Sequence, residues 1–222
     1  MNSVKGAINH IRWDEKTCKV QIETIYNGHP QGLCASGMID FLYLLRSTGL
    51  LAAEGRILNT KEAKKHVHRL TLAKLKNTFG YDCLSDDDLG NGIFTIHKNP
   101  DIYMTTKDCQ NLLKAIAAVK TGIEILLSEQ KIDIADLNHF IIAGGLGEHI
   151  DSKHAVSIGM FPEHIDEKLL CAGNTSLKGA ISALCDSEVF SVINNISQSV
   201  DYLELANHSD FADTYIKHLK YK

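Results

Sequence analysis

A short apolar run that ends in a cluster of glycines constrains the fold of this chain more than any other segment. Residues 140–143 read Phe-Ile-Ile-Ala, and residues 144–147 read Gly-Gly-Leu-Gly. A brief, continuous apolar run is typical of a strand buried on both faces, as in a parallel sheet. The preceding segment 107–129 has the apolar spacing of a long amphipathic helix. Helix, buried strand and glycine turn in this order favour a layered α/β domain.

The remaining patterns predict one α/β unit with an N-terminal hairpin. Alternating apolar and polar residues at 6–13 and 18–25, joined by four polar residues, predict a β-hairpin. Further helices are expected at 38–46, 60–78, 152–157, 176–185 and 210–219, and short strands at 93–96, 102–104, 168–171 and 202–205. The long helix has an apolar stripe made of Leu112, Leu113, Ile116, Val119, Ile123 and Leu126. Since no repeat or low-complexity linker divides the chain, we expect a single domain, with the hairpin in 1–31 and the α/β part in 32–222.

Charge and composition argue against several classes of protein. The 23 lysines and arginines are interleaved with 27 acidic residues, which gives a net charge of −4 and no basic field for a nucleic acid or an anionic membrane. The apolar segment 112–127 is interrupted by Lys114, Lys120 and Glu124, so it is too polar to span a membrane. The first residues lack the apolar stretch of a secretory signal. We therefore expect a cytoplasmic protein without a nucleic-acid or membrane partner.

The cysteines and histidines show no pattern of a disulfide framework or a metal site. The six cysteines are scattered, and no two lie within four residues of each other. Zinc and iron–sulfur sites normally include at least one close pair, so reduced buried thiols are the better interpretation. His66 and His68 point apart on a helix, and we interpret the other histidines as surface and loop residues. We expect no bound metal.

Three turns combine small residues with a following helix, at 32–37, 143–147 and 172–175. Such a turn lets a phosphate or a nucleoside approach the backbone, but a tight strand-to-helix connection needs the same residues. The dinucleotide fingerprint is not met, because Ile150 stands where its third glycine is required. The Walker phosphate loop and the Gly-x-Ser-x-Gly nucleophile elbow are also missing.

The order of these turns resembles the C-terminal part of the ATP-dependent reductive activators of corrinoid proteins. These activators belong to the superfamily of acetate and sugar kinases, heat-shock chaperones and actin (ASKHA). The similar segments are Gly32–Asp40, Ile142–Asp151, Ile158–Pro162 and Gly173–Ala180, together with Lys5–Ile8, Tyr202–Leu205 and Phe211. The resemblance covers nearly the whole chain and implies an actin or ribonuclease H-like lobe, with a mixed sheet flanked by helices.

The resemblance also implies a site. Ala143, Gly144, Gly145, Leu146 and Gly147 match the superfamily's adenosine motif, on which the nucleoside of ATP rests. The turn that contains Ser36 and Gly37 matches the helix start that faces the nucleotide cleft. We interpret Gly173 and Asn174 as residues that shape the packing of the final lobe.

Other parts of the family's machinery are absent from these residues. In full-length members a ferredoxin domain with a 2Fe–2S cluster and two Asp-x-Gly-Thr phosphate loops, which position magnesium, precede this part. The 222 residues contain no Asp-x-Gly-Thr and no cysteine cluster. Because phosphoryl transfer depends on positioned charges, we predict no catalytic residue here and no ATP hydrolysis by this lobe alone. The expected partner is a corrinoid protein or the missing N-terminal half of the activator.

One departure from the family and one shared motif each keep an alternative open. Leu113, Ala115 and Ile116 stand where members commonly carry Gln and Ala-Lys. Without that lysine, the chain is alternatively a docking or dimerisation module that no longer binds nucleotide, with a homodimer as one form. The other alternative is a fragment of an acetate or sugar kinase-like enzyme, which shares the adenosine turn.

Overall fold

The computed structural model describes residues 2–14, 16–17, 19–165 and 167–221. The described strands are β1 (Ala7–Asp14), β2 (Lys19–Thr24), β3 (Gly32–Leu33), β4 (Leu84–Asp86), β5 (Gly92–Lys98), β6 (Asp101–Thr105), β7 (Phe140–Ala143) and β8 (Leu169–Gly173). The described α-helices are α1 (Ala35–Ser47), α2 (Thr60–His66), α3 (Arg69–Phe79), α4 (Thr106–Gln130), α5 (Gly145–His149), α6 (Ser152–Ser157), α7 (Thr175–Cys185), α8 (Ser187–Ser199) and α9 (Phe211–His218). The strands form three small sheets, ordered β2-β1-β3, β4-β5-β6 and β7-β8.

The N-terminal hairpin is confirmed. β1 and β2 pair antiparallel with Ile11 opposite Ile22, while β3 adds to β1 in parallel, so this sheet is mixed. Cys18, at the start of the second predicted strand, lies outside the described residues. Helix α1 packs directly on the sheet, and a side chain at Gly37 would collide with the carbonyl oxygen of Ile8. The glycine therefore allows the helix and strand backbones to approach closely.

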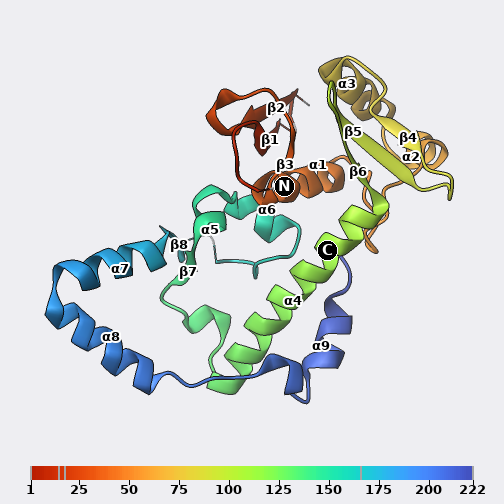
Figure 1. Ribbon diagram of the computed structural model, residues 1–222. Coiled ribbons are helices and arrows are strands. Elements are labelled where there is room, and N and C mark those ends of the chain that lie inside the picture. The colour runs from red at the N-terminus through yellow and green to blue at the C-terminus, as the bar shows by residue number, and fades with distance from the viewer. Residues whose placement is uncertain (1, 15, 18, 166, 222) are drawn as a thin grey trace.

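The core lies between α1, the sheet β4-β5-β6 and the N-terminal half of α4. Phe41 of α1 meets Phe94 of β5 edge to ring, with 5.2 Å between their centroids, and both side chains are fully buried. The predicted long helix is confirmed as α4, the diagonal helix of Figure 1. It begins at a capping box in which Thr105 and Asp108 each bond the other's backbone N–H. This reciprocal bonding satisfies two of the free N–H groups at the start of the helix.

The predicted stripe of α4 is only partly correct. Leu113 and Ile116 are buried, but Val119 is 38% and Leu126 is 50% exposed. The second half of the helix packs mainly on α9, while Ile125 and Gly122 are buried in place of the outer stripe positions. The spacing identified the helix correctly, but it could not show how little of the chain covers its far end.

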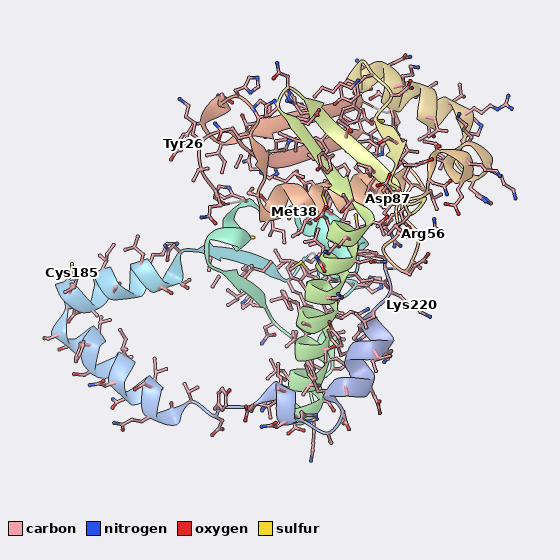
Figure 2. The ribbon with its side chains drawn as sticks, turned by 45° about the vertical axis from the view of Figure 1, so that its right-hand side comes forward. Tyr26, Met38, Arg56, Asp87, Cys185 and Lys220 are labelled. Atoms are coloured by element: carbon pink, nitrogen blue, oxygen red, sulfur yellow. The ribbon has the colours of Figure 1, made fainter. Side chains whose placement is uncertain are left out.

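The arm is the segment 174–202, which contains α7 and α8. Figure 1 shows it leaving β8, running away from the other elements and returning below the end of α4. No residue of the arm is buried. In Figure 2 its side chains extend on all sides, with Cys185 at the far tip. Helix α8 did not follow from the sequence patterns considered above.

Three further expectations are wrong. Tyr202–Leu205 was expected to be a strand, but Tyr202 is 85% exposed and residues 205–207 form a short 3₁₀ helix. No described strand lies alongside to supply the hydrogen bonds that a strand there would need. The strand 140–143 has the predicted bounds, but it is half-buried on one face and exposed on the other, where Ile141 is 61% exposed. The helix expected over 60–78 is two helices, α2 and α3, interrupted at Val67 and His68.

Candidate functional site

The glycine turn lies at the carboxyl ends of the parallel strands β7 and β8. Ala143 is paired with Gly173, and the Gly144 N–H donates to the Gly173 carbonyl at 2.8 Å. The turns after the two strands are thereby held side by side. In α/β sheets, ligands bind outside the carboxyl ends of parallel strands, so this edge is a natural place for one.

The three glycines of the turn differ in whether the fold requires a glycine at their position. Gly144 has a φ of +96°, a backbone conformation that other residues adopt only with strain. Gly147 packs against β7, where an added Cβ would approach the Ile142 side chain to 2.5 Å. At Gly145 an added Cβ would meet no described atom within 4 Å. The fold therefore requires Gly144 and Gly147, whereas Gly145 faces open space.

The other predicted members of the site differ in what the structure shows of them. Ala143 is exposed at the end of β7, and the Leu146 side chain lies outside the described part of the chain. Ser36 is 4% exposed and donates its hydroxyl to the Asn9 carbonyl at 2.9 Å. Ser36 and Gly37 thus contact β1. Their helix also packs on α5, which begins inside the glycine turn, and on α6. Their role in nucleotide binding stays a prediction.

The turn after β8 has structural contacts. The Gly173 carbonyl accepts the bond from Gly144, and the Asn174 side chain accepts from the Leu177 N–H at 3.0 Å, capping α7. The Lys178 ammonium donates to the Ala172 carbonyl at 2.8 Å. These contacts agree with the interpretation of Gly173 and Asn174 as residues that shape local packing.

A buried carboxylate beside the turn was missed by the sequence analysis. Asp40 of α1 is 1% exposed, and its oxygens contact His10 Nδ1 at 3.2 Å and His154 Nδ1 at 2.6 Å. The Ile11 N–H also donates to it, at 3.0 Å. The available signal was an acidic residue between Ile39 and Phe41 in a strongly apolar helix, since a buried charge needs partners.

The two positions expected to depart from the family are occupied by core residues. Leu113 is 4% and Ile116 is 5% exposed, and both belong to the hydrophobic core. They serve packing in this fold, and neither offers a charge to a ligand. Among the residues described, no three His, Cys, Asp or Glu side chains are grouped so as to hold a metal ion. In the same part of the chain, no helix is both long and apolar enough to cross a bilayer.

Comparison with known proteins gives consistent matches. A family model described as the C-terminal domain of RACo, the ASKHA domain, matches residues 1–222. The corrinoid activation enzyme RamQ of Eubacterium limosum is 30% identical over 219 residues, which cover 97% of this chain and 35% of that protein. A reductase of the Co(II) methylated amine-specific corrinoid protein from Methanosarcina barkeri is 28% identical over 124 residues, or 55% of this chain and 23% of the relative.

A solved structure shares the fold. The chain matches a reductive activator for corrinoid, iron–sulfur protein with a TM-score of 0.81 and 28% sequence identity. The match covers 100% of this chain and 33% of the other. The chain thus spans about a third of the length of RamQ and of the solved activator, although both matches cover nearly all of this chain.

Proposed function

Because this chain belongs to the family of C-terminal ASKHA domains of RACo, we propose that it is the nucleotide-side lobe of a reductive activator of corrinoid proteins. The proposed lobe extends over residues 1–222 and binds the adenosine part of ATP at the turn 143–147. The corrinoid protein, named in the relatives' titles, is the proposed partner of the complete activator. The phosphate loops, magnesium and the 2Fe–2S cluster are proposed to belong to the rest of that activator. The lobe alone is then unable to hydrolyse ATP, since phosphoryl transfer needs positioned charges that this sequence lacks.

The observation that carries this proposal is the open space at Gly145. Neither a positive φ nor a close neighbour requires a glycine there. A residue without a side chain, at the carboxyl end of a parallel strand, leaves the backbone free for a flat ring to lie on it. The adenine and ribose of ATP fit this requirement, because they can be held by contact with the chain without a nearby charge.

Isothermal titration of the chain with adenosine and with ATP tests the proposal. A lobe that binds only the nucleoside part has similar, weak affinity for both ligands. Strict dependence on the triphosphate, or no binding of either ligand, would contradict the proposed mode. An ATPase assay of the chain alone is expected to show no turnover above the uncatalysed rate.

A pair of glycine variants locates the binding. Gly145→Val places a branched side chain in the open space, and we expect at least about a tenfold loss of adenosine affinity from the lost contact. Gly179→Val is the matched control, because Gly179 of α7 also has no described atom within 4 Å of an added Cβ but lies outside the turn. Both variants should retain the circular dichroism spectrum of the unmodified chain. Equal loss of affinity in both variants would place the nucleoside elsewhere.

The arm favours a second function, as a docking module. Its exposed apolar residues recur at helical spacing, namely Leu177, Ile181 and Leu184 on α7, and Phe190, Ile193 and Ile196 on α8. Over 174–202 the charged residues are Lys178, Asp186, Glu188 and Asp201. A large apolar surface with few charges suits a permanent partner better than a transient one.

We propose that a permanent partner covers the arm, either a second copy of this chain or a sibling subunit, whereas a corrinoid protein that must dissociate after activation binds elsewhere. Light scattering of the purified chain distinguishes the homodimer from the monomer. A monomer at all accessible concentrations would exclude the homodimer. A homodimer that persists unchanged in Ile193→Asp would place its interface outside the arm. No observation favours a fragment of an acetate or sugar kinase-like enzyme.

A further inference from the structure

The buried Asp40 joins three elements that are far apart in the sequence. The carboxylate lies on α1, one partner (His10) and the Ile11 N–H lie on β1, and the other partner (His154) lies on α6. A carboxylate oxygen accepts hydrogen bonds, and His154 donates to it in the tautomer that carries a proton on Nδ1. Because Asp40 is 1% exposed, water does not compete for these bonds.

His154 is held from a second direction by an aromatic contact. Its ring stacks on Tyr43 of α1, with 4.0 Å between centroids and 15° between planes. The His154 side chain is 13% exposed. Donor bond and stacking together fix the position of α6 on α1, with little freedom for the ring to rotate.

The segment between the glycine turn and His154 is short. The turn runs directly into α5, which contains Gly145 and Gly147 and ends at His149, and the next residue, Ile150, is 8% exposed. Asp151 caps α6 by accepting from the N–H groups of Lys153 and His154. A displacement of α6 on α1 would therefore be transmitted to the turn through few intervening bonds.

We infer that Asp40 and His154 are positioning residues for the adenosine turn, and this inference rests on the proposed function. The bond between them anchors the turn's C-terminal side to α1, so that Gly144 and Gly145 keep the backbone conformation on which the nucleoside rests. Neither residue is assigned contact with the nucleoside. The Arg12 guanidinium, which interacts electrostatically with Asp40 and Asp151, belongs to the same charged neighbourhood.

Two substitutions of His154 separate its bond from its stacking. His154→Phe keeps a ring on Tyr43 and removes the donor, leaving the buried Asp40 without one of its partners. His154→Asn keeps a donor near the place of Nδ1 and removes the ring. His149→Phe is the matched control, since His149 is nearer to the turn along the chain but exposed.

Two readouts are measured on each variant: amide hydrogen exchange of residues 144–149, and adenosine affinity by titration. We expect His154→Phe to speed exchange of the turn and to weaken adenosine binding, each about tenfold. His154→Asn restores both values to within about threefold of the unmodified chain, and His149→Phe changes neither. Rescue by the donor-preserving variant is a result that a loss of ring packing alone would not give.

The outcomes distinguish failure of this inference from failure of the proposed function. Turn exchange that is unchanged in a folded His154→Phe, or raised equally throughout the chain, overturns the positioning role. In another outcome the unmodified chain binds no adenosine, while His154→Phe alone shows faster amide exchange of the turn. This result overturns the nucleotide function and leaves the positioning role standing. If His154→Phe fails to fold, His154→Gln replaces it, because its longer side chain moves the donor away from Asp40.

Discussion

The segment 35–47 and the arm hold similar apolar residues in opposite environments. In α1, Phe41, Leu42 and Leu44 have no exposed surface. In the arm, Leu184 is 88% and Phe190 is 57% exposed, although the helical spacing is just as regular. The difference is one of available neighbours, since α1 lies between two sheets and α6, while the arm contacts little besides itself. Apolar periodicity therefore predicts a helix, but it does not show whether other elements of the same chain bury that helix.

The largest expected effect is a difference in unfolding free energy between two identical substitutions. Phe41→Ala removes a fully buried ring that packs on Phe94, and we expect a loss of about 3–5 kcal/mol. Phe190→Ala removes a ring of the arm that is exposed in the single chain, for which we expect a change within about 0.5 kcal/mol in the monomer. Urea denaturation followed by circular dichroism measures both.

Similar losses of unfolding free energy in the two phenylalanine variants would contradict the expected difference between α1 and the arm. In that case the arm would be packed in the protein in solution, and a second copy of the chain would be the first candidate to cover it. Repeating the denaturation at several protein concentrations distinguishes this case, because the stability of a dimer depends on concentration.

The second expected effect is a difference in thiol reactivity. Burial raises the pKa of Cys109 on α4 to about 12, so this thiol is protonated and shielded at neutral pH. Cys185, at the tip of the arm, is exposed. We expect Cys185 to react with iodoacetamide at least about a hundredfold faster than Cys109. Mass spectrometry of tryptic peptides over time measures both rates. The measurement uses a Cys18→Ser variant, because Cys18 lies outside the described residues.

Local patterns predicted the elements better than their environments. The apolar spacing over 107–129 placed α4 to within one residue at each end, and Phe140–Ala143 had the right bounds, because both signals depend on neighbours in sequence. The exposure of Ile141 and Val119 did not follow, since it depends on which distant elements cover them. Tyr202–Leu205 has strand-like residues but no strand beside it among those described.

The same limit applies to the candidate site. The glycine turn could be identified from sequence, because glycines directly after an apolar run are a pattern of neighbouring residues. That Gly37 serves contact with β1 required the three-dimensional arrangement. The link between Asp40 and His154 joins residues 114 positions apart, and no spacing rule connects them.

The third expected effect is a gain of stability in the arm. Gly179 lies inside α7 with open space around it, so Gly179→Ala removes backbone entropy from the unfolded state without a collision. We expect the helix to gain about 0.5–1 kcal/mol, seen as slower amide exchange over 175–185. Gly37→Ala is the contrasting substitution, and its collision with the Ile8 carbonyl should lower the melting temperature. Slower exchange beyond the arm in Gly179→Ala would show that the arm and the rest unfold together.

The smallest expected effect concerns the joint where the chain returns from the arm to α4. His218 of α9 contacts Glu124 through Nε2 at 2.7 Å, and Lys217 contacts the same carboxylate at 3.0 Å. Burial lowers the pKa of His218, and the bond to Glu124 only partly opposes this. For Glu124, burial acts to raise the pKa, but Lys217 and His218 together lower it.

Both titrations make acid unfavourable for this joint. In the unfolded chain His218 takes up its proton at a higher pH than in the folded chain, so stability declines as the pH falls below about 6.5. The Glu124 contribution is present at neutral pH and is lost at lower pH, as the folded carboxylate becomes protonated. We expect the amide exchange of α9, corrected for its intrinsic pH dependence, to be faster at about pH 5.5 than at about pH 7.5. In His218→Gln we expect the corrected exchange of α9 to depend less on pH. Slower corrected exchange of α9 at the lower pH would contradict the assigned direction. An equal increase of exchange in α1 would show that acid destabilises the whole chain and not only the contact between α9 and α4.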